Sequence, residues 1–388
     1  MNSLLIITTI PATIRAFLLP FADRFRERHW RVDAMACGIS DNAECLQAFE
    51  RVWDVEWSRN PLDPRNFLVA PRVIREVVKT EQYDLIHVHT PVAAFVARYA
   101  LKDLKKQLKF QVIYTAHGFH FHPLGKPLKN AVFLNLEKLA GPWTDYLVTI
   151  NREDESAAKR YEILPPERVR YMPGIGVDLD RYSPNAVSEG DVEQVRHEMG
   201  LNEENKLFLS VIEFIPRKHP QDVLKAFAKL ARPDVHLAFA GDGPMLAQMQ
   251  QLASDLGIKN QVHFLGNRRD VPTLMRASVA TLLASEQEGL PRSVMESLSL
   301  EIPVIATKIR GTQELLESGC GLLYEVGDID GFAAAMAWML DRPEEVREMG
   351  KRGREFMADY DLRKIIKLHE ELYAEALSEN ASSFTRGG

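Results

Sequence analysis

Short apolar runs alternate with segments of helical period along almost the whole chain. Ten of these runs lie at residues 4–9, 31–37, 84–90, 111–118, 145–150, 206–212, 235–241, 262–266, 279–285 and 303–307. Near-continuous apolar strands separated by amphipathic helices are typical of parallel sheets whose two faces are both covered by helices. The pattern therefore predicts an α/β fold built from doubly wound parallel sheets.

The alternation pauses once, in the polar stretch 182–205, and then restarts. A chain of 388 residues corresponds to two domains at roughly 100–200 residues each. We therefore expect one Rossmann-like domain over residues 1–185 and a second over residues 200–355, facing each other across a cleft. Residues 356–378 have the period of a helix, which we expect to return to the first domain.

Composition and charge exclude several classes of protein. The net charge of −6 is mild and argues against nucleic-acid binding. Three cysteines, an odd number without metal-ligand spacing, fit a reduced, cytosolic setting. The apolar first residues lack the basic start and cleavage site of a signal peptide, and no apolar run reaches the ~18 residues of a membrane-spanning helix. We expect a cytoplasmic protein without a transmembrane segment.

The most informative segment is SEQEGLPRSVME, residues 285–296, which follows an apolar strand and leads into a helix. In an open α/β sheet, ligands bind beyond the carboxyl ends of the strands. A strand–loop–helix turn at that edge offers backbone N–H groups and the positive end of a helix to a diphosphate. Gly289, Leu290 and Pro291 form the turn, in which glycine allows a close backbone approach and proline suits the first helical residues.

Two glutamates flank this turn, and both are candidate ligand contacts. Glu288, in the loop, is placed to reach a sugar beyond the phosphates. Glu296 lies on the helix, on the side of its opening, where acidic residues of dinucleotide folds bind a ribose. Two glutamates eight residues apart are more often solvated surface acids, but the buried strand and the Gly-Leu-Pro turn favour a binding role here.

Histidines gather in the first half of the chain. His117 ends an apolar strand and is followed by glycine, which places it at the ligand-binding edge of the sheet. His120 and His122 lie in the next loop, where they could touch an acceptor, and no nearby carboxylate completes a metal site with them. His87 and His89 alternate along another strand, where core packing or strand-end hydrogen bonding is the better interpretation.

The segment 285–296 resembles the Glu-x7-Glu signature of the family 4 retaining glycosyltransferases, which have the GT-B fold of two Rossmann-like domains. The resemblance continues over most of residues 206–330. In the first half, TAHGFHFHPL, TINREDESAAKRY and MPGIGVDLDRYSP resemble the branch that builds bacterial exopolysaccharide and capsule repeat units. The resemblance implies that the first domain binds the acceptor and the second binds a nucleotide sugar, here expected to be a UDP-sugar.

The resemblance also implies a role for individual residues. Glu288 would contact hydroxyls of the donor sugar, Glu296 the nucleotide ribose, and His117 the sugar near its reacting carbon. The catalytic candidates are His117, Glu288, Lys218 and Arg217. The candidates for binding the nucleotide sugar are Glu296, Gly289, Leu290, Pro291, Gly241, Asp242, Gly243, Asn267 and Arg268, the last two near the base.

The chain departs from the family pattern at two places. The family usually has Gly-Arg-Leu followed by a lysine, and its Arg and Lys both bind the diphosphate. Here Glu213 takes the place of the Arg, while Lys218 stands at the lysine position. We expect Arg217 to restore the lost charge, because Arg binds phosphate with two parallel hydrogen bonds. The glycine-rich loop after the first strand is also missing, and Thr9, Ile10 and Pro11 stand there instead.

No pair of carboxylates of the glycosidase type is evident in the first domain. We therefore expect a front-face reaction, in which the acceptor hydroxyl attacks from the side that the diphosphate leaves. Cationic side chains and the start of the helix near Pro291 would stabilise the departing diphosphate. This scheme needs no metal, and we expect no cofactor other than the nucleotide-sugar co-substrate.

Other functions share this scaffold and stay open. These are a GT-B enzyme with a soluble acceptor, a sucrose- or glycogen-type transferase, a UDP-sugar epimerase and an inactive module that binds sugar nucleotides. The presence of Glu288, Glu296, Lys218 and His117 argues against the inactive module. A dinucleotide oxidoreductase fails because no Gly-x-Gly-x-x-Gly follows the first strand.

Basic charge concentrates in residues 98–138, which hold eight Lys or Arg against two Asp or Glu. In residues 99–110, leucines 101, 104 and 108 would share one helical face with lysines beside it, and residues 17–31 form a second basic amphipathic stretch. Lysines near an anionic bilayer contribute ~1 kcal/mol each. Because the resembled branch uses lipid-linked glycan acceptors, we expect peripheral attachment to the cytoplasmic face of the membrane through these two stretches.

Overall fold

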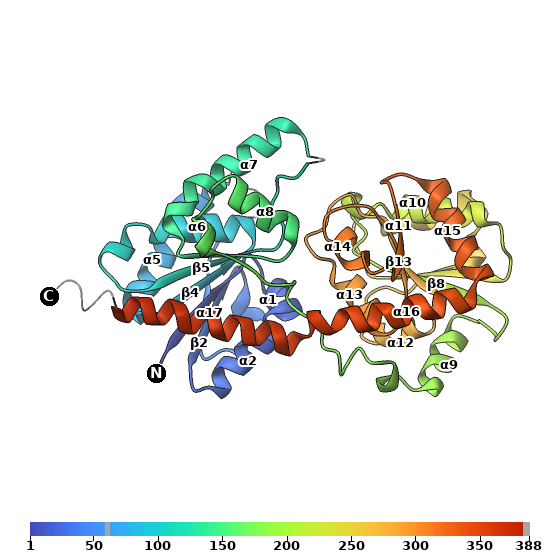
Figure 1. Ribbon diagram of the computed structural model, residues 1–388, viewed down its shortest axis with the longest axis horizontal. Helices are drawn as coiled ribbons and strands as arrows, with labels where there is room; N and C mark the ends of the chain where they lie inside the picture. The colour runs from blue at the N-terminus through green and yellow to red at the C-terminus, as the bar shows by residue number, and fades with distance from the viewer. Residues whose placement is uncertain (59–62, 124, 383–388) are drawn as a thin grey trace. The chain divides into compact units, whose positions relative to one another are not determined.

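The computed structural model describes residues 1–58, 63–123 and 125–382. The chain forms two compact units, shown in Figure 1. Unit 1 comprises Met1–Ile175 and the end of the chain from Lys364, and unit 2 comprises Gly176–Arg363. Unit 2 begins before the expected boundary because Val177 hydrogen-bonds Tyr360 and Leu362 through its backbone.

A parallel sheet in the order β3-β2-β1-β4-β5-β6-β7 forms the centre of unit 1. Its strands are β1 (Ser3–Ile7), β2 (Arg31–Ala36), β3 (Val52–Asp54), β4 (Leu85–His89), β5 (Gln111–Ala116), β6 (Tyr146–Thr149) and β7 (Val169–Tyr171). The first, fourth and fifth strands are buried throughout or nearly so, which explains their continuous apolar sequences. The strand order reverses between β1 and β4, so the loops after these strands flank the position at which doubly wound folds bind ligands.

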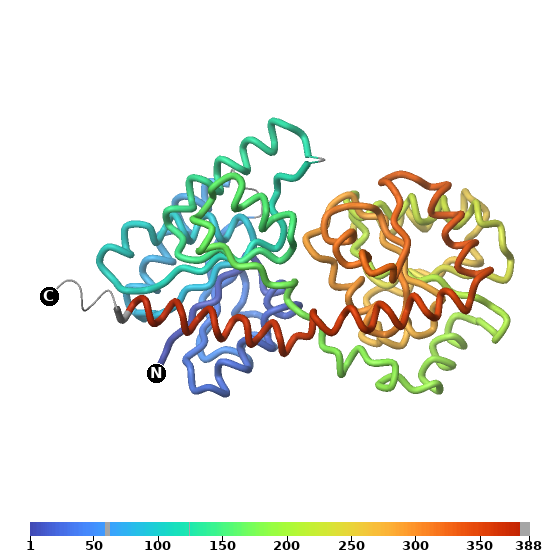
Figure 2. The backbone as a smooth tube through the Cα atoms, viewed as in Figure 1, coloured from blue at the N-terminus to red at the C-terminus, as the bar shows by residue number. Residues whose placement is uncertain are grey.

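Helices cover the sheet of unit 1 on both faces (Figure 1). They are α1 (Pro11–Phe17), α2 (Leu19–Glu27), α3 (Ala43–Ala48), α4 (Arg65–Leu68), α5 (Ala70–Glu81), α6 (Pro91–Leu101), α7 (Pro127–Ala140), α8 (Arg152–Arg160) and α17 (Leu362–Ser382). Figure 2 shows the last of these, in red, beside the blue N-terminal segment of the same unit.

The C-terminal helix α17 is bound to unit 1 along its length. Glu370 accepts hydrogen bonds from Arg24 at 2.7 Å and from Arg28 at 3.0 Å, both in or next to α2. Further along, Tyr373 stacks on Phe25 with ring centroids 4.8 Å apart. These contacts join the two ends of the sequence into one core.

This packing corrects the expectation that residues 17–31 offer a membrane-binding face. Phe21 and Phe25, the apolar side of α2, are buried, 4% and 1% exposed. The arginines that were expected to meet a bilayer pair with Glu370 instead. The amphipathic pattern of this stretch reflects packing inside unit 1, so it contributes no membrane surface.

Unit 2 is built on a second parallel sheet, in the order β10-β9-β8-β11-β12-β13. Its strands are β8 (Lys206–Val211), β9 (Val235–Ala240), β10 (Val262–Phe264), β11 (Ala280–Leu283), β12 (Val304–Thr307) and β13 (Gly321–Tyr324). Its helices are α9 (Glu189–Glu198), α10 (Pro220–Leu230), α11 (Leu246–Asp255), α12 (Val271–Arg276), α13 (Arg292–Ser299), α14 (Thr312–Leu316), α15 (Ile329–Asp341) and α16 (Pro343–Met357). Here the strand order reverses between β8 and β11.

The predicted fold class of two Rossmann-like units with parallel sheets is confirmed. Each of the ten predicted strands is present, and the structure adds β3, β7 and β13 at the sheet edges. The polar stretch 182–205 also contains a helix, α9. Among the described residues, none of the helices combines the length and the apolarity that crossing a bilayer requires.

Candidate active site

The signature segment lies where the sequence predicted, between β11 and α13 of unit 2. Pro291 occupies the N-cap position of the helix, which begins at Arg292. Leu290 and Pro291 are buried under the turn, which fixes the loop on the core. Because β11 flanks the reversal of strand order, the loop that carries Glu288 lies at the ligand-binding edge of this sheet.

Two cations from the neighbouring strand's loop meet Glu288. After β8 the chain makes a short 3-10 turn, Pro216–Lys218, before α10. The Nζ atom of Lys218 lies 2.5 Å from Oε1 of Glu288, and a guanidinium nitrogen of Arg217 lies 3.7 Å from Oε2. Arg217 also donates to the Gln287 carbonyl at 2.5 Å. We call Arg217, Lys218 and Glu288 the charged cluster.

The charged cluster is partly screened from water. The side chains of Glu288 and Lys218 are 10% and 16% exposed, and that of Arg217 is 39% exposed. Ion pairs are stronger at such sites than on an open surface, because less water screens them. The backbone carbonyl of Glu288 accepts from the buried guanidinium of Arg310 at 3.1 Å, a supporting contact that the sequence analysis missed.

Glu296 lies deeper than its neighbours in the signature. It is 7% exposed, and an oxygen of its carboxylate lies 2.7 Å from Nε of Arg292, one turn earlier on α13. The Tyr182 side chain lies close enough to influence the same carboxylate. Burial raises the pKa of Glu296, and Arg292 and Tyr182 oppose that rise. Tyr182 was also missed, because nothing in its local sequence connects it with a residue more than a hundred positions away.

Gly241 and Gly243 have a packing role that explains why both are glycine. Their φ angles are +143° and +153°, and a Cβ at either position would lie 1.8 Å from the Ile212 carbonyl or 2.7 Å from Phe214 backbone atoms. The Asp242 carbonyl accepts from the backbone N–H of Phe214 at 2.9 Å. The loops after β8 and β9 are therefore joined backbone to backbone.

The remaining donor-site candidates are placed less favourably. Asn267 is exposed after β10, at the far end of the sheet from β11. Arg268 is held in ion pairs with Asp270 at 2.5 Å and Glu198 at 3.0 Å, and Asp270 raises its pKa. The Glu213 side chain, which replaces the usual Arg, is exposed.

In unit 1, His117 lies just beyond the carboxyl end of β5. Its Nε2 atom lies 3.1 Å from Nδ1 of His89, the last residue of β4. Burial lowers the pKa of His117 to about 4, so its imidazole is neutral near pH 7. Phe17, the last residue of α1, stacks on His117 with ring centroids 6.1 Å apart.

The expected loop after His117 is partly internal. Phe119 and Phe121 are buried and stack on each other at 4.7 Å, while the His120 ring packs against Phe133 at 4.9 Å. Within residues 1–58, 63–123 and 125–382, no three His, Cys, Asp or Glu side chains are grouped as ligands for a metal ion.

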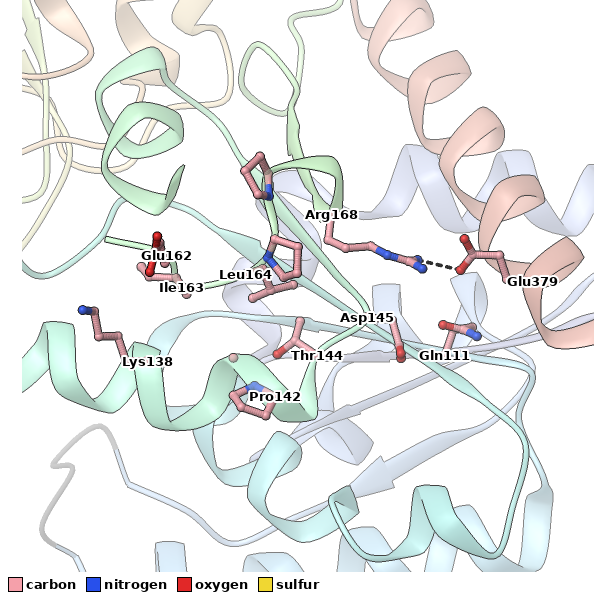
Figure 3. Close-up of a pocket in the computed structure, with 13 residues that line it drawn as sticks. Gln111, Lys138, Pro142, Thr144, Asp145, Glu162, Ile163, Leu164, Arg168 and Glu379 are labelled. Carbon is pink, nitrogen blue, oxygen red and sulfur yellow. Dashed lines mark hydrogen bonds and ion pairs between the residues drawn. The ribbon is translucent and has the colours of Figure 1, made fainter. Parts of the chain in front are cut away.

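A hollow of about 820 Å³ lies elsewhere on unit 1 (Figure 3). Gln111, Asp145 and Arg168, which begin or immediately precede β5, β6 and β7, line it, and Arg168 is bonded there to Glu379 of α17 at 2.6 Å. These are the amino ends of the strands, opposite the edge that carries His117. The hollow is therefore separate from the candidate site.

Family comparisons agree with this geometry. A family model described as Glycosyltransferase Family 4 matches residues 16–181, and one described as Glycosyl transferases group 1 matches residues 191–356. The putative glycosyltransferase EpsD of Bacillus subtilis is 32% identical over 377 residues, 96% of each chain. The chain belongs to glycosyltransferase family 4. It is a glycosyltransferase of the GT-B fold that uses a nucleotide-sugar donor.

Other proteins resemble the chain over much of its length. The UDP-Gal:alpha-D-GlcNAc-diphosphoundecaprenol alpha-1,3-galactosyltransferase of Escherichia coli is 28% identical over 69% of this chain and 68% of its own. The N-acetyl-alpha-D-glucosaminyl L-malate synthase of Bacillus anthracis is 28% identical over 86% and 85%. HepE of Anabaena, solved with UDP and glucose, superposes with a TM-score of 0.80 at 21% identity, covering 97% of this chain and 100% of that one.

Proposed function

We propose that this protein transfers a sugar from a UDP-sugar to a lipid-linked glycan acceptor, with retention of configuration. The observation that carries the proposal is the charged cluster, because it places two cations and a carboxylate together where the strand order of unit 2 reverses. The names of the E. coli galactosyltransferase and of the UDP-bound HepE support UDP as the nucleotide.

Each member of the proposed site has one task. Lys218 and Arg217 bind the diphosphate and stabilise the charge that develops as it leaves, with the start of α13 adding backbone N–H groups. Glu288 accepts hydrogen bonds from hydroxyls of the sugar, and Glu296 does so from the ribose. His117 contacts the transferred sugar. The acceptor hydroxyl attacks on the face that the diphosphate leaves, and its proton passes to a phosphate oxygen.

A donor screen tests the reaction. We expect nucleoside diphosphate release from one or more UDP-sugars, at a rate that EDTA leaves unchanged, because Lys218 and Arg217 supply the positive charge that a metal would otherwise supply. Product NMR should show the anomeric configuration of the donor. Activity that requires added Mg²⁺ or Mn²⁺, or an inverted product, would contradict the proposed mechanism. Release of UDP that does not depend on the acceptor would indicate hydrolysis of the donor.

A soluble acceptor is the second candidate. It is favoured by the likeness to the L-malate synthase of Bacillus anthracis, which extends over 86% of this chain. Extraction of radiolabelled product into organic solvent identifies a lipid-linked acceptor, whereas retention in the aqueous phase identifies a soluble one. Interconversion of UDP-sugars without transfer would instead indicate an epimerase, and UDP-sugar binding without turnover an inactive module.

Residues 99–110, which we expected to meet the membrane, do not form such a surface. The prediction that the leucines of residues 99–110 share one helical face was wrong, because α6 ends at Leu101 and a separate 3-10 turn follows. Leu101 and Leu104 are buried, 0% and 4% exposed. Lys105 pairs with Asp145 at 2.5 Å. This stretch is therefore part of the core and offers no apolar face to a bilayer.

Helix α7 offers the surface that the earlier stretch lacks. Leu128, Val132 and Leu139 are 79%, 51% and 55% exposed and lie along one side of the helix at spacings of four and seven residues. Exposed lysines at 126, 129 and 138 accompany them. An apolar stripe beside lysines matches the interface of an anionic bilayer, where apolar side chains enter and lysines meet lipid phosphates. We propose that α7 attaches the protein peripherally to the membrane.

Vesicle co-sedimentation tests this surface. We expect binding to vesicles containing anionic lipid, release by high salt, and loss of most binding in Leu128→Glu/Val132→Glu, because the stripe then carries charge. The control is Lys351→Glu on the exposed side of α16 in unit 2, which changes charge away from the stripe. Equal binding to neutral and anionic vesicles, or full binding by the α7 variant, would rule this surface out.

A further inference from the structure

Next to His117, the candidate sugar contact, lies a second histidine for which the proposed function has no role. His89 is 2% exposed, and its ring lies between those of His87, at a centroid distance of 4.1 Å, and His117, at 5.3 Å. Its Nδ1 atom is within hydrogen-bond distance of Nε2 of His117, 3.1 Å away. One of these two nitrogens must carry the shared proton.

The surroundings of the other ring nitrogen of His89, Nε2, decide which of the two bonded nitrogens carries the proton. Nε2 of His89 is buried and has no hydrogen-bond partner in the part of the chain that the structure describes. A neutral imidazole has one N–H and one acceptor nitrogen. If the proton were on Nε2, a buried N–H would have no acceptor, and such orphaned donors are rare and costly. With the proton on Nδ1, the only N–H of His89 donates to His117.

This arrangement fixes the proton of His117 as well. Because its Nε2 accepts from His89, the N–H of neutral His117 must be at Nδ1. His117 is half-buried, unlike His89, and lies just beyond the carboxyl end of β5, at the edge of the sheet where ligands bind. We infer that His89 is a positioning residue that holds His117 in its Nδ1–H form, so that His117 offers a hydrogen-bond donor, and not a base, to a hydroxyl or phosphate oxygen of the substrate.

The surroundings keep His89 in place. His87 on the same strand is bonded to Thr115 at 2.7 Å and to Tyr373 at 2.5 Å, which closes that side of the histidine stack. On the other side Thr90 has an unusual backbone, with φ of +63°, and its hydroxyl lies 2.6 Å from that of Thr9. Non-glycine residues at such positive φ are strained and cluster at functional sites.

The charge state of the pair supports the inference. Burial lowers the pKa of His89 well below its usual value, and His87 and His117 lower it further. His369 and Tyr373, on α17, face the same stack, and His369 lowers the pKa of His117 as well. With their pKa values lowered in this way, both imidazoles are neutral near pH 7.

Nitrogen NMR tests the inference directly, without a sugar donor. In protein with ¹⁵N-labelled histidine, two-bond spectra distinguish Nδ1–H from Nε2–H, and His117→Asn identifies the His117 signals. We expect Nδ1–H for His117 in the wild type. In His89→Leu the donor is lost, and His117 should shift toward Nε2–H. His89→Asn should retain the wild-type pattern, since an asparagine N–H occupies nearly the same position as the Nδ1–H of histidine.

His87→Leu is the matched control, because it removes a buried histidine from the same face of the same strand but one not bonded to His117. It should lower the melting temperature and leave the His117 signals in the Nδ1–H pattern. Wild-type His117 with its proton on Nε2 would overturn the inference, even if no variant folds. An unchanged pattern in folded His89→Leu would overturn it too.

Kinetics then connect the pair to the reaction, a step that rests on the proposed role of His117. We expect His89→Leu to lower kcat/KM for the sugar donor on the order of tenfold while UDP affinity is unchanged, and His89→Asn to restore it. Equal losses in His89→Leu and His87→Leu would show that only packing is affected. Because the NMR result needs no turnover, it decides the tautomer even if the transfer assay contradicts the proposed function.

Discussion

Replacing Glu288 by alanine is expected to lower kcat by on the order of 10²-fold or more while UDP binding is retained or becomes tighter. The carboxylate would contact the sugar hydroxyls, where binding energy that is realised in the transition state raises kcat. It contributes nothing attractive to a diphosphate. On the contrary, it is paired in the free protein with Lys218 at 2.5 Å, and its removal leaves that cation available to the phosphates.

The measurement combines steady-state kinetics with calorimetric titration of UDP. Glu288→Gln keeps the shape of the side chain and separates the loss of charge from the loss of contacts. Glu286→Ala is the matched control, because Glu286 lies in the same loop but is 56% exposed and contacts His219 instead. Turnover that survives in Glu288→Ala, or a loss of UDP affinity as large as the loss of kcat, would remove Glu288 from its proposed role.

The fold could be predicted because its main signal is local. Strands buried on both faces need apolar residues at nearly every position, and β1, β4 and β5 show this in their sequences. The strands β3 and β7 are only three residues long, and β13 is only partly buried, so none has an apolar run that stands out. Short edge strands are set by pairing with a neighbour, which a single sequence does not display.

The site was predictable only in part, for a related reason. The turn from Glu288 to Glu296 is one continuous motif, whereas the contact of Lys218 with Glu288 spans seventy residues and depends on the pairing of β8 with β11. The sequence predicted core packing or strand-end hydrogen bonding for His89, and the buried contact with His117 agrees with this. It did not predict the partner, because alternation along a strand shows which residues share a face and not which side chains lie beside them. The register that sets His89 opposite Thr115 brings His117 within reach.

The membrane surface expected from the sequence shows how an amphipathic pattern can mislead. In the sequence, the spacing of Leu101 and Leu104 beside nearby lysines suggests an exposed helical stripe. In the structure, both leucines belong to the hydrophobic core of unit 1. On α7 the corresponding residues, such as Leu128, are exposed, although the sequence pattern is weaker. Hydrophobic periodicity predicts that a face is buried somewhere, and only the packed structure distinguishes burial in the core from a face left for a bilayer.

Replacing Lys218 by alanine is expected to weaken UDP binding by about 10- to 100-fold, since a hydrogen bond to a charged group contributes roughly 1.5–3 kcal/mol. Uridine should bind almost as before, because it has no phosphate. The salt dependence of UDP binding should also become shallower. Calorimetry on both ligands at two salt concentrations measures this, with Lys225→Ala on the exposed side of α10 as the control for removing one positive charge.

The pairing with Glu288 makes a double variant more decisive than either single one. In Lys218→Ala the Glu288 carboxylate keeps only the more distant Arg217, 3.7 Å away, and repels the incoming diphosphate. Lys218→Ala/Glu288→Gln removes that repulsion, so UDP affinity should recover in part while kcat stays low, because the charges of both side chains are missing in the transition state. Additive losses in the double variant would show that the two side chains act independently, and equal weakening of uridine and UDP would show that Lys218 does not bind the phosphates.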